Sequence, residues 1–453
     1  MVGFVALALA DGCTPASPDA PAPVVTPSAR AAVNRDLAGD LLGALKLVRQ
    51  EYRNAVASGG GTVTDATEYA ETELFAEQAE RKAVTWRAAG GLADVAQADE
   101  LARRLAAIRG AVGRKAPHAA VVEETTAVIA IVQQAMAGAV PESIRGVLLA
   151  TARADQAIQA EEIAGDYRIG LVSDRAQPIF VRSGESLVSA AAAPADAAYV
   201  AVLLRERRTK RPLSGADVDL VVEGQGTRIE ARLAELWGDL HQYGANIALP
   251  ADGAVTIMVR VAPPAYARHG DTLNVFVAPE TVTFRGHVRG RELAFDAKAV
   301  MPVDQDYGVG DDMLQAIAEA GELHDTGGYR VGLIVEGPEP IWQWKDGKPV
   351  LEPVPADATN HVEVVLVDRE SGQLVPRAGI DLVFLANGNE VGRAILTPLL
   401  SAFSHYGRTI VVPRSATSVR IHVHPPAIGA LGRPRLADPA DVELRLPAQR
   451  KES

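Results

Sequence analysis

The sequence predicts an N-terminal all-α helical bundle followed by two all-β immunoglobulin-like sandwiches. The chain has 453 residues, enough for about three domains of ordinary size. Residues 31–164 carry apolar side chains at three- and four-residue spacing, which is typical of amphipathic helices. Residues 165–300 and 325–448 instead hold short β-branched runs between turn residues, which is typical of strands.

The two strand-rich regions are copies of one unit. Residues 167–172 (YRIGLV) echo residues 329–334 (YRVGLI), and residues 216–221 (ADVDLV) echo residues 378–383 (AGIDLV). The offset is 162 in both cases (329−167 and 378−216). A constant offset indicates an internal repeat. Each copy has about seven short strands without interleaved helices, the pattern of an immunoglobulin-like sandwich.

These patterns set the expected domain boundaries. We expect a leader and tether at 1–30, the helical domain at 31–164, the first sandwich at 165–300, a linker at 301–324 and the second sandwich at 325–453. The linker is acidic, but it lacks the glycine and terminal glutamate spacing of a calcium loop. We therefore interpret it as a solvated charge run.

The helical domain has clear stop and start signals. Its first apolar stripe ends before three glycines at 59–61, which favour a helix end, and Thr64 or Asp65 could cap the next helix. We expect the later helices at about 68–86, 92–110, 118–137 and 142–163. Periodicity alone supports only a packed core here.

Composition excludes several function classes. The net charge of −12 argues against nucleic-acid binding, which usually needs a basic face. The single cysteine, Cys13, excludes an intramolecular disulfide and a thiolate metal cluster. The chain has no glycine-rich phosphate loop, no Gly-x-Ser-x-Gly and no His-Glu-x-x-His. We therefore expect a protein that is not an enzyme.

The first 12 residues form an apolar run too short to cross a bilayer as a helix. The run is similar to the end of a secretory signal with a lipoprotein cleavage site, so Cys13 is the candidate lipidated residue. The residues after it have a flexible tether composition. This predicts a periplasmic or cell-envelope protein whose membrane contact is a lipid anchor. Cleavage without lipidation and a disordered tail are the alternatives.

A pattern of acidic and aromatic residues runs through residues 41–75. It includes Glu51-Tyr52 and Glu68-Tyr69-Ala70-Glu71. The segment resembles the extracytoplasmic helical domain at the front of many bacterial high-affinity iron permeases. The Arg-Glu-x-x-Glu signatures of the permease itself are absent, as is any apolar run of about 20 residues. The resemblance implies an inner-membrane iron permease complex as partner.

A second set of motifs lies in the strand-rich copies. The first copy has Tyr-Gly-Ala-Asn at 243–246, then Pro-Pro at 263–264 and Arg-His-Gly-Asp at 268–271; the second has His-Tyr-Gly at 405–407. This series resembles the periplasmic ferrous-iron transport protein family. The resemblance implies an immunoglobulin-like fold and a role in iron acquisition. It also implies a metal site of histidines from these segments, a methionine, and a His and Glu of an early strand.

The candidate metal ligands are His241, His269 and His405. In the first copy Gln242 occupies the histidine position of the family and His241 lies one residue early, which on a strand turns the side chain to the other face. In the second copy His405 keeps that position, but Gly-Arg-Pro-Arg at 432–435 replaces the Arg-His motif. The early strands at 167–172 and 329–334 contain no histidine.

Each copy thus retains about one ligand, whereas a transition-metal site needs three or more donors at about 2 Å. The family forms dimers, so we predict a composite site that pairs His269 of one copy with His405 of the other, for Fe²⁺ or Cu²⁺. The predicted function is an exported accessory protein of bacterial iron uptake that binds metal or hands it to a permease. The alternative is an envelope scaffold that binds no metal.

Overall fold

A computed structural model describes residues 27–446 except for 93, 137–141, 185, 191–196, 208, 270–271, 297–315, 318–319, 321–322 and 402. The predicted leader with its candidate lipidation site, Cys13, lies outside the described residues, as does most of the linker predicted at 301–324. No described helix is both long enough and apolar enough to cross a membrane.

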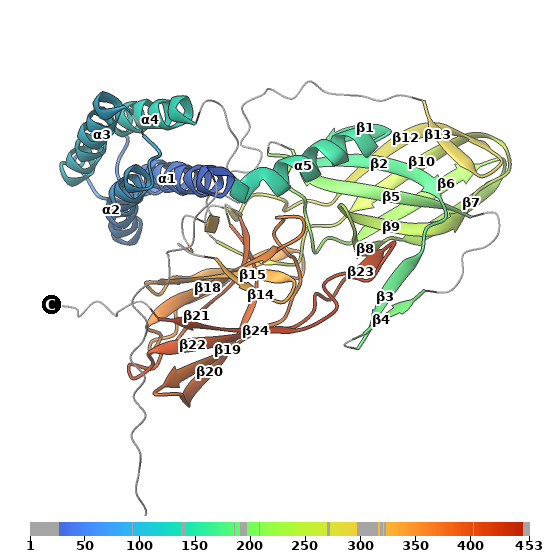
Figure 1. Cartoon of the computed structure of the whole chain (residues 1–453). Helices are drawn as coiled ribbons and strands as arrows, with labels where there is room; N and C mark the ends of the chain where they lie inside the picture. Colours follow the sequence, from blue (N-terminus) through green and yellow to red (C-terminus); the bar gives the residue numbers. More distant parts are fainter. Residues whose placement is uncertain are drawn as a thin grey trace, which may run out of the picture.

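Helices come first and strands follow (Figure 1). Four helices form a bundle: α1 (Pro27–Ala55), α2 (Ala66–Ala88), α3 (Val95–Gly113) and α4 (His118–Ala135). Its core contains Leu41, Leu45 and Tyr52 of the predicted stripe, together with Trp86. The side chain of Asp65 accepts hydrogen bonds from the first amides of α2, as the sequence predicts.

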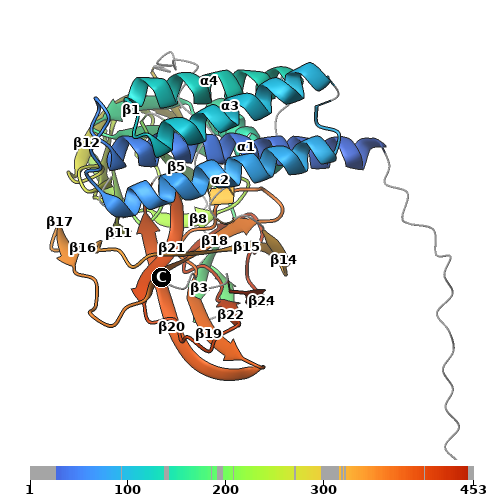
Figure 2. The same ribbon diagram turned by 90° about the vertical axis from the view of Figure 1, so that its left-hand side faces the viewer.

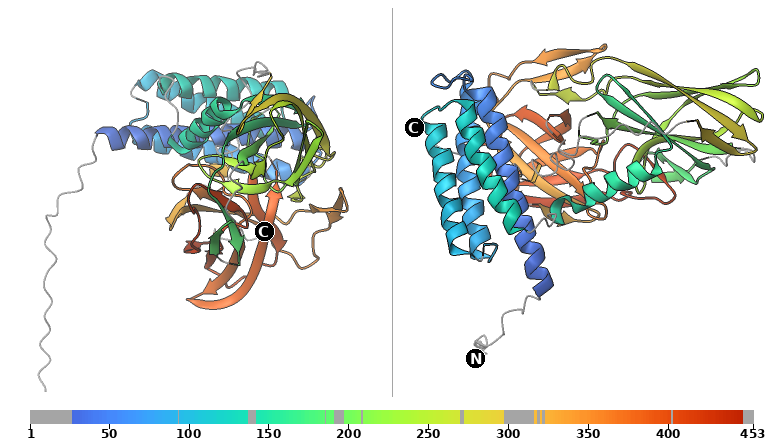
Figure 3. Two further views of the ribbon diagram at one scale, coloured as in Figure 1. Left: turned by 90° about the vertical axis from the view of Figure 1, so that its right-hand side faces the viewer. Right: turned by 90° about the horizontal axis from the view of Figure 1, so that it is seen from above.

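The fifth helix, α5 (Glu142–Ala157), contacts α1 of the bundle and runs along the strands (Figure 3). Ala154 near its end and the following Ile158 pack on Leu203 of a strand. The predicted helix 142–163 is wrong for its last residues. Residues 160–164 form a strand, because pairing with the neighbouring strand edge satisfies their backbone groups.

The strands fall into two units. The first β unit comprises β1 (Ala160–Ala164), β2 (Tyr167–Arg175), β3 (Ile179–Ser183), β4 (Ser186–Ser189), β5 (Ala197–Glu206), β6 (Val218–Gly224), β7 (Thr227–Arg232), β8 (Ala234–Trp237), β9 (His241–Ala248), β10 (Gly253–Val261), β11 (Ala267–Arg268), β12 (Glu280–Arg289) and β13 (Glu292–Phe295). The second β unit comprises β14 (His324–Thr326), β15 (Tyr329–Glu336), β16 (Ile341–Lys345), β17 (Lys348–Glu352), β18 (Asn360–Asp368), β19 (Ile380–Ala386), β20 (Asn389–Leu400), β21 (Ser404–Ile410), β22 (Ser418–Val423), β23 (Gly429–Leu431) and β24 (Ala440–Arg445).

Strand order repeats between the two units. One sheet runs β1-β2-β5-β9-β8-β23-β3-β4, and its counterpart runs β14-β15-β18-β21-β20-β11-β16-β17. Read in this order, each strand of the first sheet has its repeat counterpart at the same place in the second, as β5 has β18 and β9 has β21. A second layer faces each sheet, so that Val202 of β5 packs in one core with Ile257 of β10, and Val364 of β18 packs in another with Leu382 of β19. The described strands therefore follow the internal repeat that the sequence predicts.

Each unit gives the other a short strand. β11, from the first unit, pairs in parallel with the end of β20 and antiparallel with β16. β23, from the second unit, pairs in parallel with β8 and antiparallel with β3. The exchange carries the residues after β11 into the second unit. The helical bundle lies over this region of the second unit (Figure 2).

Candidate metal centre

β18 supplies two of the candidate ligands. His361 and Glu363 stand two residues apart on this strand and so share one face. The strand is central, paired with β15 along one edge and β21 along the other, and residues 361–368 are buried on both of its faces. His361 has no exposed surface and Glu363 is 3% exposed. A charged group this deep needs partners.

His405 comes from the neighbouring strand β21. In the register of this pair Glu363 lies opposite Gly407, so His405 stands two residues away on the facing strand. The glycine is required here, because a Cβ at position 407 would lie 2.8 Å from Nε2 of His361. The Tyr-Gly of the repeated motif thus leaves room for an imidazole on the adjacent strand.

His269 is contributed by the first β unit through the exchanged strand β11. Its backbone N–H donates to the carbonyl of Leu400. The preceding Arg268 is fully buried, and its guanidinium donates to the carbonyls of Pro264, Val275 and Phe276. These hydrogen bonds fix the segment that presents His269 to the second unit.

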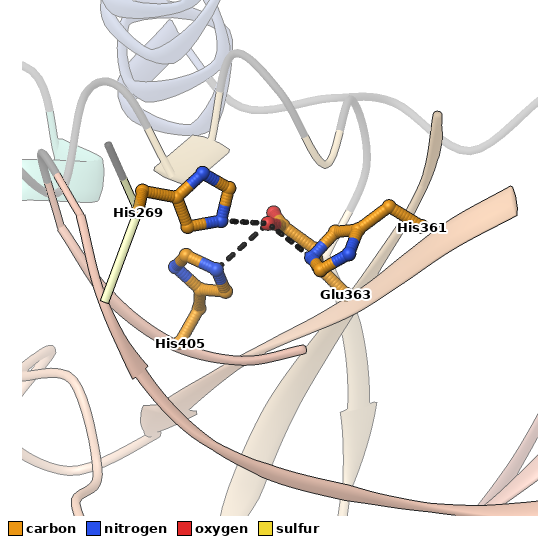
Figure 4. Close-up of side chains that lie close together, drawn as sticks. All are labelled: His269, His361, Glu363 and His405. Atoms are coloured by element: carbon orange, nitrogen blue, oxygen red, sulfur yellow. Dashed lines mark ion pairs between the residues drawn. The ribbon is translucent and has the colours of Figure 1, made fainter. Parts of the chain in front are cut away.

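The four side chains converge on one point (Figure 4). Oε1 of Glu363 lies 2.7 Å from Nε2 of His405, 3.2 Å from Nε2 of His361 and 3.5 Å from Nε2 of His269. One ligand atom from each residue lies within 4.8 Å of all the others. We call these four residues the histidine centre.

Outer hydrogen bonds orient two of the imidazoles. The Thr409 hydroxyl donates to the carbonyl of Glu339 and lies 2.8 Å from Nδ1 of His361, so this hydroxyl accepts from Nδ1–H. Nδ1 of His405 lies 3.3 Å from the carbonyl of Phe403, which can only accept. Both contacts place a proton on Nδ1, so that Nε2 is the ring atom that a metal ion would take.

Nε2 of His361 and Nε2 of His405 are buried, and each faces the shared carboxylate of Glu363. Burial alone would raise the pKa of Glu363, but the three histidines outweigh it and hold that pKa well below its usual value. Burial raises the pKa of the adjacent Glu339. The arrangement offers three imidazoles and a carboxylate, the ligand types of transition-metal sites.

The structure brings together two of the three predicted ligands. His269 and His405 meet in one site, with their ring centroids 5.7 Å apart. The prediction of His241 as a ligand is wrong, because its Nε2 lies 2.8 Å from Glu235 instead. The position of β9 that is equivalent to His405 is Gln242, and neighbouring residues of a strand point to opposite faces.

Sequence reasoning missed His361 and Glu363. Histidine was sought in the strand at 329–334, whereas both residues lie on the next long strand, β18. A signal was available in the alternation His-x-Glu on an otherwise apolar run at 361–367. Two polar residues on one face of a buried strand indicate a site.

The equivalent positions in the first unit carry neither a histidine nor a carboxylate. Tyr199, Ala201, Gln242 and Leu431 occupy the positions of His361, Glu363, His405 and His269 by strand register and repeat offset. Tyr199, Ala201 and Leu431 pack in one hydrophobic cluster with Leu236. Among the described residues, the centre in the second unit thus has metal-ligand side chains, whereas its counterpart in the first unit does not.

Comparison with known proteins identifies the bundle. Residues 28–140 match the family model of the iron permease-associated 4-helix bundle domain, which confirms the resemblance of residues 41–75. No curated protein matches the chain.

Solved structures of FetP from a uropathogenic Escherichia coli strain are also similar. The protein as isolated shares 16% identity, covers 29% of this chain and 95% of FetP, and has a TM-score of 0.24. A copper-bound variant of FetP shares 15% identity over 29% of this chain and 97% of its own, with a TM-score of 0.25.

Proposed function

We propose that this protein is an extracytoplasmic accessory of bacterial iron uptake, built from immunoglobulin-like domains, that binds Fe²⁺ or Cu²⁺ at the histidine centre. Its role is to hold or hand over the metal rather than to catalyse a reaction. The observation that carries this proposal is the convergence of three Nε2 atoms, from two β units, on Glu363.

The oriented tautomers support binding over simple packing. Buried histidines that only stabilise a core normally have both ring nitrogens hydrogen-bonded. Here His361 and His405 each meet an outer partner at Nδ1, while their Nε2 atoms converge, with that of His269, on the single carboxylate of Glu363. That is the arrangement of metal-ligating histidines, whose other nitrogen meets an outer partner.

The helical bundle supports a membrane partner. Its family is associated with iron permeases. The cavity beside the histidine centre is lined from one side by the bundle residues Gln50, Glu51 and Phe75. A permease docked on the bundle would therefore lie close to the bound metal. We propose that the partner is an inner-membrane iron permease, with the chain held in the periplasm or at the envelope.

Metal titration tests the proposal. We expect isothermal calorimetry of the metal-free protein to give binding of Cu²⁺, and of Fe²⁺ without oxygen. His269→Ala and His405→Ala should each weaken binding by more than the roughly 10–100-fold that follows loss of an outer-shell partner. His287→Ala is the matched control, because this histidine is half exposed on β12 and pairs with Asp296, outside the histidine centre.

Unchanged Cu²⁺ and Fe²⁺ affinity in both His269→Ala and His405→Ala would refute the proposal. That result would favour the alternative function, an envelope scaffold that binds no metal. Equal weakening in His287→Ala would also contradict it, since this would indicate binding to surface histidines in general.

A further inference from the structure

A cavity of about 530 Å³ lies between the helical bundle and the histidine centre. The second β unit lines it with Glu336, Glu339 and Glu363, and His269 opens onto it as well. No lysine or arginine is among the described residues that line it. The cavity is roomy enough for ions with their water, and its wall is strongly acidic.

Four of the acidic residues come from the bundle, and three of these form a compact group apart from Asp65. Glu51 lies in the last turns of α1, and Glu68 and Glu71 stand three residues apart in the first turns of α2, where their side chains share a face. One carboxylate oxygen of each lies within 4.8 Å of the others. We call these residues the carboxylate cluster.

Glu51 sets this group apart from an ordinary acidic surface. It is only 7% exposed, and its side chain lines the cavity. Within the described part of the chain, none of the three glutamates forms an ion pair with a lysine or arginine, although many exposed glutamates elsewhere do. A buried carboxylate whose neighbours are further carboxylates is a costly arrangement unless a cation joins it.

The electrostatics agree with this geometry. Burial, followed by the contacts with Glu68, raises the pKa of Glu51 to about 11. Burial, followed by the charge of Glu68, raises the pKa of Glu71 to about 8, and His269 is the basic group that opposes this shift. Both shifts disfavour the charged form, as expected for carboxylates packed together without a cation.

We propose that Glu51, Glu68 and Glu71 form a second metal site, with an all-oxygen ligand set, that faces the histidine centre across one cavity. Carboxylate oxygens select hard cations, whereas imidazole suits copper, zinc and iron. The site therefore takes a hard di- or trivalent cation. That iron is its natural occupant rests on the proposed function, whereas the site itself rests on its own geometry.

Terbium(III) is a suitable probe, because it is a hard trivalent cation whose luminescence is sensitised by a nearby indole. Trp342 lines the same cavity and supplies that indole. We expect saturable Tb³⁺ luminescence in the full chain upon tryptophan excitation. The double variant Glu68→Gln/Glu71→Gln should lose most of it, whereas Glu123→Gln, at an exposed position on α4, should not.

Two further variants locate the ion. Trp342→Phe should lose the sensitised signal while calorimetry still detects Tb³⁺ binding. His405→Ala should retain the Tb³⁺ signal although it loses Cu²⁺. Because His405→Ala affects copper alone, a failure of Cu²⁺ binding and a failure of Tb³⁺ binding can be distinguished from each other.

Stability distinguishes a metal site from a structural cluster. Removing like charges should leave the melting temperature of the metal-free double variant equal to or above that of the parent, and Tb³⁺ should raise the melting temperature of the parent alone. The proposal is overturned if the double variant binds Tb³⁺ like the parent. It is also overturned if His405→Ala abolishes the signal, or if the metal-free double variant is destabilised.

Discussion

The ring centroids of His269 and His361 lie 5.4 Å apart, and the two ring planes are nearly perpendicular at 88°. The two residues belong to different copies of the repeat. Their contact exists because the first unit inserts β11 between β20 and β16 of the second. The histidine centre is therefore assembled from both β units within one chain, so the metal affinity proposed for it should not depend on protein concentration.

Thr409 should control metal affinity without touching the metal. Its hydroxyl accepts from Nδ1 of His361 and donates to the carbonyl of Glu339. Thr409→Val keeps the shape but removes both hydrogen bonds, so the imidazole loses its fixed tautomer. We expect Cu²⁺ affinity to fall by roughly 10–100-fold, measured by competition with a chelator. Thr409→Ser, which keeps the hydroxyl, should retain near-parental affinity, and equal loss in both variants would contradict this role.

Gly407→Ala should disturb the same imidazole by steric means. The added Cβ would lie 2.8 Å from Nε2 of His361, closer than two such atoms can approach. The ring must move, and we expect a clear loss of Cu²⁺ affinity together with a changed Cu²⁺ electron paramagnetic resonance spectrum.

Gly388→Ala is a weaker comparison, because its positive φ of 79° strains any side chain, but nothing lies near its Cβ. It should lower stability and leave the spectrum unchanged. An unaltered spectrum in Gly407→Ala would mean that His361 is not a ligand.

His241 and His405 should show opposite phenotypes. His241 is buried against Glu235 and the rings of Trp237 and Tyr243, away from the histidine centre. We expect His241→Ala to lower the free energy of unfolding by roughly 1–3 kcal/mol, because Glu235 loses a buried partner. Its Cu²⁺ affinity should stay at the parental value. Loss of copper binding in His241→Ala, with His405→Ala unaffected, would reverse the assignment.

The architecture was more accessible from the sequence than the site was. Helix periodicity and the constant repeat offset predict the bundle and the doubled β region, because both depend on local pattern. The pairing of His269 with His405 was also predicted, but as a consequence of family resemblance rather than of any local signal.

The missing half of the site depends on strand register. Glu363 and His361 reach the centre only because β18 pairs with β21 in one particular alignment. Likewise Glu51 meets Glu68 and Glu71 through the packing of α1 on α2, which periodicity does not specify. Contacts between distant segments leave little trace in one sequence.

Glu235 should make the contact between the two β units sensitive to acid. It lies in the first unit and accepts from the Ser214 hydroxyl, from His241 at 2.8 Å and from Arg377 of the second unit at 3.0 Å. Burial by itself would raise the pKa of Glu235, but the hydrogen bond and charge of His241, with help from Ser214 and Arg377, leave it below the usual value.

The sign of the effect follows from that lowered pKa. A carboxyl whose pKa is lower in the folded state adds stability above its unfolded pKa of about 4.3, and the contribution disappears as the pH falls through the folded pKa. Glu235→Gln should therefore be less stable than the parent at pH 7, by roughly 1–3 kcal/mol. The difference should shrink below about pH 4, as measured by urea unfolding at several pH values. A difference that stays constant from pH 7 to pH 3 would show that the ionised carboxylate contributes nothing to the contact between the units.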